Sequence, residues 1–166
     1  MSFETNVDKI HWSKRTPEVT KKRGKEFLDR LIIFVRYPEP GKTKTRLIPA
    51  LGPEGAADLH RRMSEHTLAW TRKLQNASAV SLEIRFAGGN ENRFHQWLGS
   101  DIPCFHQGNG DLGERMARAF NEAFQAGMSR VILVGTDCPD LTEGLVEKAL
   151  EALNHHDVVL GPARDG

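Results

Sequence analysis

The sequence predicts a three-layer α/β protein, with a mostly parallel β-sheet covered by helices on both faces. Short apolar runs rich in β-branched residues, such as Leu31 to Val35 and Val131 to Val134, are typical of strands buried on both faces. Helical segments of 10 to 20 residues separate these runs, which is the alternation that builds parallel sheets. The apolar runs also end in loops rich in glycine, proline and charged residues, where such sheets bind ligands.

Length and composition limit the function classes. A chain of 166 residues is long enough for one domain with a substantial core. Lys and Arg number 23 against 22 Asp and Glu, so no overall charge favours nucleic acid or a membrane surface. No apolar run approaches the roughly 18 residues of a membrane span, and Cys104 and Cys138 lack metal-ligand spacing. We therefore expect a cytoplasmic protein that binds neither nucleic acid nor membrane.

The chain divides into an arm and a domain. Residues 1–26 are polar, without periodicity, and include the basic run Lys21 to Lys25. We expect them to form a mobile basic arm. Residues 27–166 contain no linker or repeat, so we expect them to form a single α/β domain.

The first strand, Leu31 to Val35, delivers a basic loop to the edge of the sheet. Pro38, Pro40 and Gly41 end the strand. Three cations follow: Lys42, Lys44 and Arg46. Such a loop is typical of a phosphate site, although a solvated basic turn is the alternative. It is not a P-loop, because Arg36 stands at the first glycine position and the prolines offer no N–H.

The later elements alternate along the chain. Gly52-Pro53-Glu54 begins a long helix, with Pro53 suited to the first turn and Glu54 to the helix dipole. Its predicted buried face carries Leu59, Met63, Thr67, Trp70 and Leu74. Then follow a strand (Ser81–Ala87), a helix (Glu91–Leu98), a strand (Ile102–His106), a helix from Leu112 to Gly127, a strand (Val131–Val134), a helix carrying Leu145 to Leu153, and a strand (Asp157–Leu160).

Carboxylates also follow the predicted strands. Asp137 comes after Val131 to Val134, and Asp165 follows the last strand. Magnesium and manganese prefer oxygen ligands, commonly one or two carboxylates plus substrate phosphates. Asp137 could instead cap the next turn, but Asp140 fits that role better because Glu143 completes an Asp-x-x-Glu box.

The glycine loop Gly108 to Gly113 is open to two interpretations. Its glycine spacing matches the dinucleotide fingerprint of nicotinamide or flavin enzymes, and Asp137 follows at a compatible distance. However, Asp111 and Glu114 also form an Asp-x-x-Glu capping box, which would place anions where a pyrophosphate should bind. A dinucleotide oxidoreductase remains an alternative on sequence alone.

Four ordered motifs carry a family resemblance. They are Tyr37-Pro-Glu-Pro-Gly-Lys-Thr-Lys-Thr-Arg-Leu47, Gly110-Asp-Leu-Gly-Glu-Arg-Met116, Gly135-Thr-Asp-Cys-Pro-Asp-Leu141 and Leu160-Gly-Pro-Ala-Arg-Asp-Gly166. With them, residues 31–166 resemble GT-A-like nucleotide-diphosphosugar transferases. The more specific resemblance is to bacterial glycosyltransferases associated with radical-SAM enzymes and arsenosugar biosynthesis. Guanylyltransferases acting on phospholactate look like more distant relatives.

The resemblance implies a GT-A-like, Rossmann-related fold and a glycosyltransferase that uses a nucleoside diphosphate sugar and a small acceptor. It implies catalytic and metal-binding roles for Asp137 and Asp165, with Mg²⁺ or Mn²⁺ as the cofactor. It also implies nucleotide-binding roles for Arg36, Gly41, Lys44, Arg46, Gly110, Asp111 and Gly113. A nucleotidyltransferase and a non-catalytic nucleotide-binding remnant remain alternatives.

Two departures from the family pattern shape further expectations. The usual Asp-x-Asp is reduced to Asp137 with Asp140 three residues on, which bears on metal dependence. The family also continues beyond the position of Gly166 with residues that build much of the acceptor side. We therefore expect the domain to lack its C-terminal acceptor part, to transfer sugar poorly and to self-associate.

Overall fold

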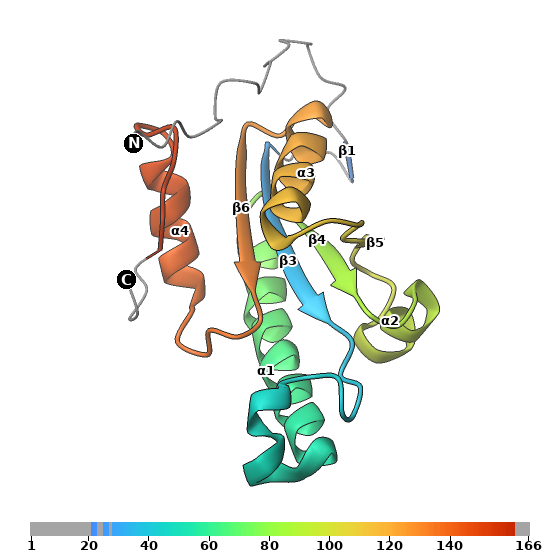
Figure 1. Ribbon diagram of the computed structural model, residues 1–166. Helices are drawn as coiled ribbons and strands as arrows, with labels where there is room; N and C mark the ends of the chain where they lie inside the picture. The colour runs from blue at the N-terminus through green and yellow to red at the C-terminus, as the bar shows by residue number, and fades with distance from the viewer. Residues whose placement is uncertain (1–20, 23–24, 27, 162–166) are drawn as a thin grey trace, which may run out of the picture.

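A four-stranded parallel sheet forms the centre of the protein, confirming the predicted α/β fold. The computed structural model describes residues 21–22, 25–26 and 28–161. The strands lie in the order β5-β4-β3-β6 (Figure 1). Their bounds are β3 (Asp29–Arg36), β4 (Val80–Ala87), β5 (Cys104–His106) and β6 (Arg130–Gly135). The connecting helices are η1 (Thr45–Leu47), α1 (Ile48–Ala77), α2 (Glu91–Leu98), α3 (Leu112–Gln125) and α4 (Glu143–Ala152).

Strand β3 is the central strand and is buried on both faces, as its apolar run predicts. It pairs with β4 from Asp29 opposite Val80, and on its other side with β6 from Asp29 opposite Arg130. Alternate side chains of a strand point to opposite faces, so Leu31, Ile33 and Val35 enter one core. Ile32 and Phe34 enter the other.

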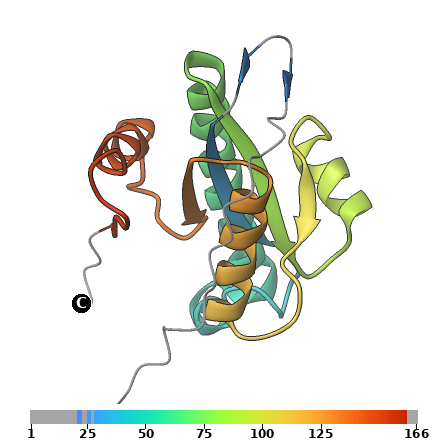
Figure 2. The same cartoon turned by 90° about the horizontal axis from the view of Figure 1, so that it is seen from above.

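Helices cover both faces of the sheet, which gives the three layers. Helices α1, α2 and α4 contribute Leu68, Phe94 and Val146 to the core on one face. Helix α3 contributes Ala119 and Ala123 to the core on the other face. Figure 2 shows α3 and α1 on opposite sides of the strands.

The order of the strands reverses beside β3. From β3 the chain moves outward to β4 and β5, and then crosses to the other side of β3 to form β6. The carboxyl ends of β3 and β6 are therefore neighbours at a topological switch point, which is where open α/β sheets bind ligands.

Helix α1 begins in two steps. Its assigned range starts at Ile48, but Gly52 has φ 70° and ψ 166°, which interrupts the helical backbone. The long regular part therefore resumes at Pro53, as predicted from the sequence. Its predicted buried face is confirmed at Thr67, Trp70 and Leu74, whereas Leu59 and Met63 are only half-buried. Three further polar side chains of α1 are also buried: His60, Ser64 and Thr71.

Two other predicted details are wrong. The predicted strand Asp157–Leu160 does not form, and Val158 and Leu160 are exposed. This segment runs beside α4, away from the sheet, where no neighbouring strand can take its backbone hydrogen bonds (Figures 1 and 2). Helix α4 is also not capped by Asp140, because its N-cap residue is Thr142.

The predicted basic arm, residues 1–26, lies mostly outside the described residues. Within it the structure describes two short strands, β1 (Lys21–Lys22) and β2 (Lys25–Glu26), which pair antiparallel. Among the described residues, no helix is long and apolar enough to cross a membrane.

Candidate functional site

The loop after β3 is held in shape by one buried threonine. Thr43 Oγ1 donates to the carbonyl oxygen of Tyr37 at 3.0 Å and accepts from the backbone N–H of Glu39 at 3.1 Å. Gly41 has φ 78°, a conformation that favours glycine. These local bonds fix the loop without using the side chain of Lys44, which contacts a group elsewhere in the protein.

Lys44 joins this loop to the one that follows β6. Its Nζ lies 2.9 Å from Asp137 Oδ1, although 93 residues separate the two in sequence. Lys44 has φ 47° and ψ 46°, a left-handed conformation that is uncommon for residues other than glycine. Its side chain is only 17% exposed, whereas that of Asp137 is 69% exposed. The predicted cation and the predicted carboxylate thus meet at the switch point.

His60, on α1, completes this group and was not predicted from the sequence. Its ring is buried, and Nε2 lies 3.0 Å from the carbonyl oxygen of Arg36 at the end of β3. Its Nδ1 lies 3.6 Å from Asp137 Oδ1, which is an electrostatic contact beyond ordinary hydrogen-bond length. The usable signal in the sequence was the i, i+4 repetition of His60 and Ser64 on one face of the helix.

Ser64 ties the same helix to the loop after β6. Its Oγ donates to the carbonyl oxygen of His60 at 2.9 Å and lies 3.2 Å from Thr136 Oγ1. Both Ser64 and Thr136 are buried. Helix α1 therefore fixes the ends of β3 and β6 relative to each other, and with them Lys44 and Asp137.

Contacts with His60 and Lys44 keep Asp137 ionised. The His60 ring contributes most, and with the Lys44 ammonium it holds the pKa of the Asp137 carboxyl well below its usual range, although partial burial acts in the opposite direction. Asp137 is therefore a carboxylate at neutral pH. An anion entering this site would approach Lys44 and compete with Asp137 for it.

The other predicted phosphate ligands lie on the same loop. Arg36 ends β3, and its Nη1 lies 3.5 Å from the carbonyl oxygen of Lys42. Both Arg36 and Arg46 are exposed. Lys42 instead pairs with Glu39 at 3.1 Å on the surface. The structure therefore places Arg36, Gly41, Lys44 and Arg46 on one loop, with Lys44 alone aimed at Asp137 among the contacts described.

The glycine loop is closed by its own contacts. Asp111 Oδ1 accepts from the Glu114 N–H and Glu114 Oε2 accepts from the Asp111 N–H, each at 2.9 Å, which confirms the predicted capping box. Gly108 and Gly110 have φ 85° and 103°, conformations that favour glycine, and the side-chain ends of Arg118 and Glu114 lie close beside them.

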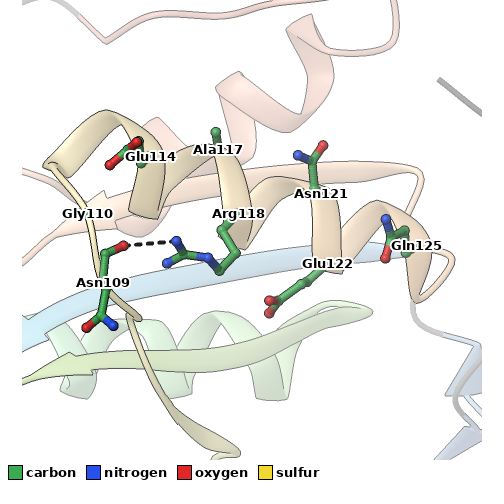
Figure 3. Close-up of a pocket in the computed structure, with 8 residues that line it drawn as sticks. All are labelled: Asn109, Gly110, Glu114, Ala117, Arg118, Asn121, Glu122 and Gln125. Carbon is green, nitrogen blue, oxygen red and sulfur yellow. Dashed lines mark hydrogen bonds between the residues drawn. The ribbon is translucent and has the colours of Figure 1, made fainter. Parts of the chain in front are cut away.

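An open groove of about 730 Å³ runs from this loop along α3 (Figure 3). At one end Arg118 Nη2 donates to the carbonyl oxygen of Asn109 at 2.9 Å. Its lining comes from the loop and one face of α3: Asn109, Gly110, Glu114, Ala117, Arg118, Asn121, Glu122 and Gln125. The groove therefore adjoins two predicted nucleotide contacts, Gly110 and Asp111, but not Asp137.

The two strand-end regions are separated across the sheet. The glycine loop follows β5 and Asp137 follows β6, with β4 and β3 between them. Three strand spacings correspond to about 14 Å. The structure thus brings Lys44 and Asp137 together and leaves Gly110, Asp111 and Gly113 at a distance. The structure also disfavours the interpretation of the glycine loop as a dinucleotide-binding fingerprint, because carboxylates cap the start of α3 where a pyrophosphate would bind.

The described residues offer a partial fit to a metal ion. No group of three His, Cys, Asp or Glu side chains within residues 28–161 could hold one. Two potential ligand atoms do lie together: a carboxylate oxygen of Asp137 and the Nδ1 of His60, which is buried without a hydrogen-bond partner. Asp165, the second predicted metal ligand, lies outside the described residues.

A mostly parallel sheet with helices on both faces and a charged loop at its switch point defines an α/β protein with a nucleotide-sugar transferase-like fold. The chain belongs to the family described as "uncharacterized protein conserved in bacteria (DUF2064)", whose sequence model matches residues 67–166.

The solved structures similar to this chain include a bacterial protein. It is a protein from Desulfovibrio desulfuricans G20, provisionally assigned as a nucleotide-diphospho-sugar transferase, with a TM-score of 0.77 and 39% sequence identity. The match covers 84% of this chain and 60% of that protein, so this chain spans less than two thirds of its relative. No curated protein matches the chain.

Proposed function

We propose that this protein binds a nucleoside diphosphate sugar and transfers the sugar to a small acceptor. One observation carries the proposal: Lys44 and Asp137 meet at 2.9 Å at the switch point of the sheet. An ammonium beside an ionised carboxylate suits a ligand that carries both phosphates and an associated divalent cation. The likeness to the Desulfovibrio protein supports the same class of donor.

Lys44 would bind the diphosphate and stabilise the negative charge that develops on it as the sugar leaves. Its left-handed backbone supports this role, since strained residues tend to cluster at functional sites. Arg36 and Arg46, exposed on the same loop, would add charge around the phosphates. Gly41 would let the loop turn closely beside them.

The glycine loop would lie near the base or ribose. It is about three strand spacings from Asp137, so a single extended ligand rather than one small ion would be needed to reach both ends. Gly110 and Gly113 would present backbone groups to the nucleoside, while Asp111 keeps the loop in shape as the cap of α3.

A divalent cation, Mg²⁺ or Mn²⁺, would supply Lewis-acid stabilisation of the departing diphosphate. Asp137 would hold it, with Asp165 as a second ligand.

For the acceptor, the resemblance to glycosyltransferases associated with radical-SAM enzymes and arsenosugar biosynthesis leads us to propose a small molecule. Acceptor contacts would come in part from segments that the longer relative has beyond the matched region.

The test is to measure which nucleotide binds and which product appears. UDP, GDP and their sugar conjugates should raise the melting temperature in the presence of Mn²⁺, whereas NAD and NADP should not. Binding to the folded state alone adds about 2.7 kcal/mol at a hundredfold excess over Kd. Free nucleoside diphosphate released from a sugar nucleotide supports the proposal. Pyrophosphate released from a nucleoside triphosphate and a sugar phosphate would assign a nucleotidyltransferase instead, and a shift with NAD alone would overturn the proposal.

A further inference from the structure

Residues of α1 and α2 line a second open pocket, together with the residue that follows β3. Its volume is about 380 Å³. Its lining is mostly polar or charged: Tyr37, Arg61, Glu65, Arg93, Gln96 and Trp97. Neither Lys44 nor Asp137 is part of this lining, so the pocket is distinct from the candidate site described above.

The pocket carries two guanidinium groups that lack a carboxylate partner among the described residues. Glu65 lies four residues after Arg61 on α1, which is the usual spacing for a helical ion pair. Its Oε1 instead accepts a hydrogen bond from Trp97 Nε1 at 2.8 Å. Arg93 likewise forms no ion pair within the described part of the chain. Two arginines against one glutamate leave the pocket with an excess of positive charge.

Tyr37 holds Arg93 in place at this pocket. The guanidinium carbon of Arg93 lies 4.9 Å from the centre of the Tyr37 ring, in a cation–π contact. The Tyr37 ring is itself packed edge-on against Phe94 and Trp97, with ring centres 5.5 and 5.9 Å away. A cation–π contact supplies no oxygen acceptor for the guanidinium N–H groups. The charge is therefore positioned while its donors remain free to bind a ligand.

We propose that this pocket binds a small phosphate ester through its phosphate group. Guanidinium groups bind phosphate through pairs of parallel N–H···O bonds. The three terminal oxygens of a phosphate monoester can bond both Arg61 and Arg93, whereas one guanidinium already occupies both oxygens of a carboxylate. This ligand would be bound in addition to the nucleotide sugar, so the inference does not depend on the proposed function.

The size and the remaining lining of the pocket favour an ester over inorganic phosphate. Pockets that hold small molecules have volumes of about 300–1,000 Å³, and the 380 Å³ here lies within that range. The Gln96 carboxamide offers both a donor and an acceptor to the part of the ligand beyond the phosphate. Hydroxyl groups, such as those of a sugar phosphate, would suit these contacts.

The experiment follows the Trp97 indole N–H by nitrogen–proton correlation NMR on the full chain. This N–H donates to Glu65 in the lining of the pocket, so a bound ligand should shift its resonance. Trp97→Phe assigns the resonance. The probes are glucose 6-phosphate, inorganic phosphate and, as a carboxylate dianion, malonate. We expect the resonance to shift at the lowest concentration with glucose 6-phosphate.

Two variants and a matched control test the arginines. Arg61→Gln and Arg93→Gln should each weaken binding of glucose 6-phosphate at least about tenfold, because each removes charge-assisted hydrogen bonds. Arg61→Gln is the decisive variant, since its side chain is exposed and the substitution leaves the contact between Arg93 and Tyr37 unchanged. Arg62→Gln is the control, because Arg62 is the next residue of α1 and pairs with Asp58 at 2.8 Å.

A phosphate could also bind at Lys44, so Lys44→Ala separates the two sites. Weaker binding in both pocket variants, with binding retained in Arg62→Gln and Lys44→Ala, supports the proposal. Binding that is lost in Lys44→Ala and unchanged in Arg61→Gln would overturn it. A Trp97 resonance that moves with neither phosphate would do the same. Malonate or inorganic phosphate binding as tightly as glucose 6-phosphate would overturn the assignment of a phosphate ester.

Discussion

Two loops of this protein carry similar residues at the carboxyl ends of parallel strands, yet the structure uses them differently. The glycine loop after β5 satisfies its charges within a few residues, through Asp111, Glu114 and Arg118. The loop after β3 instead sends Lys44 to a carboxylate 93 residues away. The contacts of the glycine loop fix the conformation of that loop alone. The contact of Lys44 instead connects two loops at the candidate site.

The difference shows how to separate structural charges from functional ones. A carboxylate that caps the next helix gains backbone hydrogen bonds that favour that conformation whether or not a ligand is present. A surface ion pair such as Lys44 with Asp137 contributes little to stability. The left-handed backbone of Lys44 is therefore consistent with the ligand-binding role that we propose for it.

The largest effect should come from Asp137. Asp137→Asn should lower sugar transfer by about 10²–10³-fold, the range observed when one preorganised electrostatic contact to a transition state is removed. The fold should be unaffected, because the side chain is 69% exposed. Release of nucleoside diphosphate under saturating donor measures the effect.

The control for this variant is Asp140→Asn, which removes a carboxylate from the same loop. It should retain most of the activity of the unmodified protein. Equal losses in the two variants would mean that the loop needs negative charge in general. Asp137 would then have no specific role that distinguishes its loop from the glycine loop.

The second effect concerns diphosphate affinity. Lys44→Ala should weaken binding of UDP or GDP by about tenfold to a hundredfold, since a charge-assisted hydrogen bond contributes about 1.5–3 kcal/mol. Lys42→Ala is the matched control, because Lys42 lies two residues away and pairs with Glu39 on the surface. Isothermal titration calorimetry distinguishes the two. Similar losses in both would indicate a diffuse basic loop, and Arg46→Ala would then be expected to behave likewise.

The fold and half of the site could be predicted from the sequence. Leu31 to Val35 is apolar at every position, which is enough to predict a strand buried on both faces. Asp137 and Lys44 each follow such a strand, so their position at the carboxyl edge also follows from the sequence. That they are neighbours depends on strand order, and β6 lies beside β3 only because the chain crosses the sheet through α3.

The features that could not be predicted from the sequence also depend on contacts between residues far apart in the chain. Hydrophobic spacing correctly placed Trp70 and Leu74 on the buried face of α1, but it placed Leu59 and Met63 there in place of their neighbours His60 and Ser64. These two polar side chains are buried because they bond to backbone and side-chain groups at the ends of β3 and β6. The predicted strand Asp157–Leu160 failed for the opposite reason, since its residues suit a strand but no described strand pairs with them.

A smaller effect should separate capping from nucleotide binding in the glycine loop. Asp111→Ala should lower the free energy of unfolding by about 1 kcal/mol, the usual cost of losing an N-cap side chain. Asp111→Asn should be nearly neutral for stability, because asparagine caps equally well. Urea unfolding measures both variants.

The same two variants show whether the Asp111 carboxylate also contacts the ligand. If it serves mainly as a cap, Asp111→Asn should change the affinity for UDP or GDP much less than Lys44→Ala does. A loss in Asp111→Asn as large as that in Lys44→Ala would make the two loops equal contributors to binding. The distinction between them would then have to be abandoned.

The smallest effect is the response of the site to acid. His60 and Lys44 hold the pKa of Asp137 below its usual range, so the folded protein binds the proton at Asp137 less readily than the unfolded chain does. Stability from Asp137 is therefore fully present above the unfolded value of about 3.9 and is lost as the pH falls below it. The contribution should be small because the side chain is largely exposed.

Urea unfolding at pH 6, 5, 4 and 3 measures this contribution. The free energy of unfolding should differ by a constant amount between the unmodified protein and Asp137→Asn down to about pH 4, and by a smaller amount below that pH. Because other carboxyl groups titrate equally in both proteins, only this difference reports on Asp137. A difference that grew on acidification would mean that His60 and Lys44 do not hold Asp137 in its ionised form.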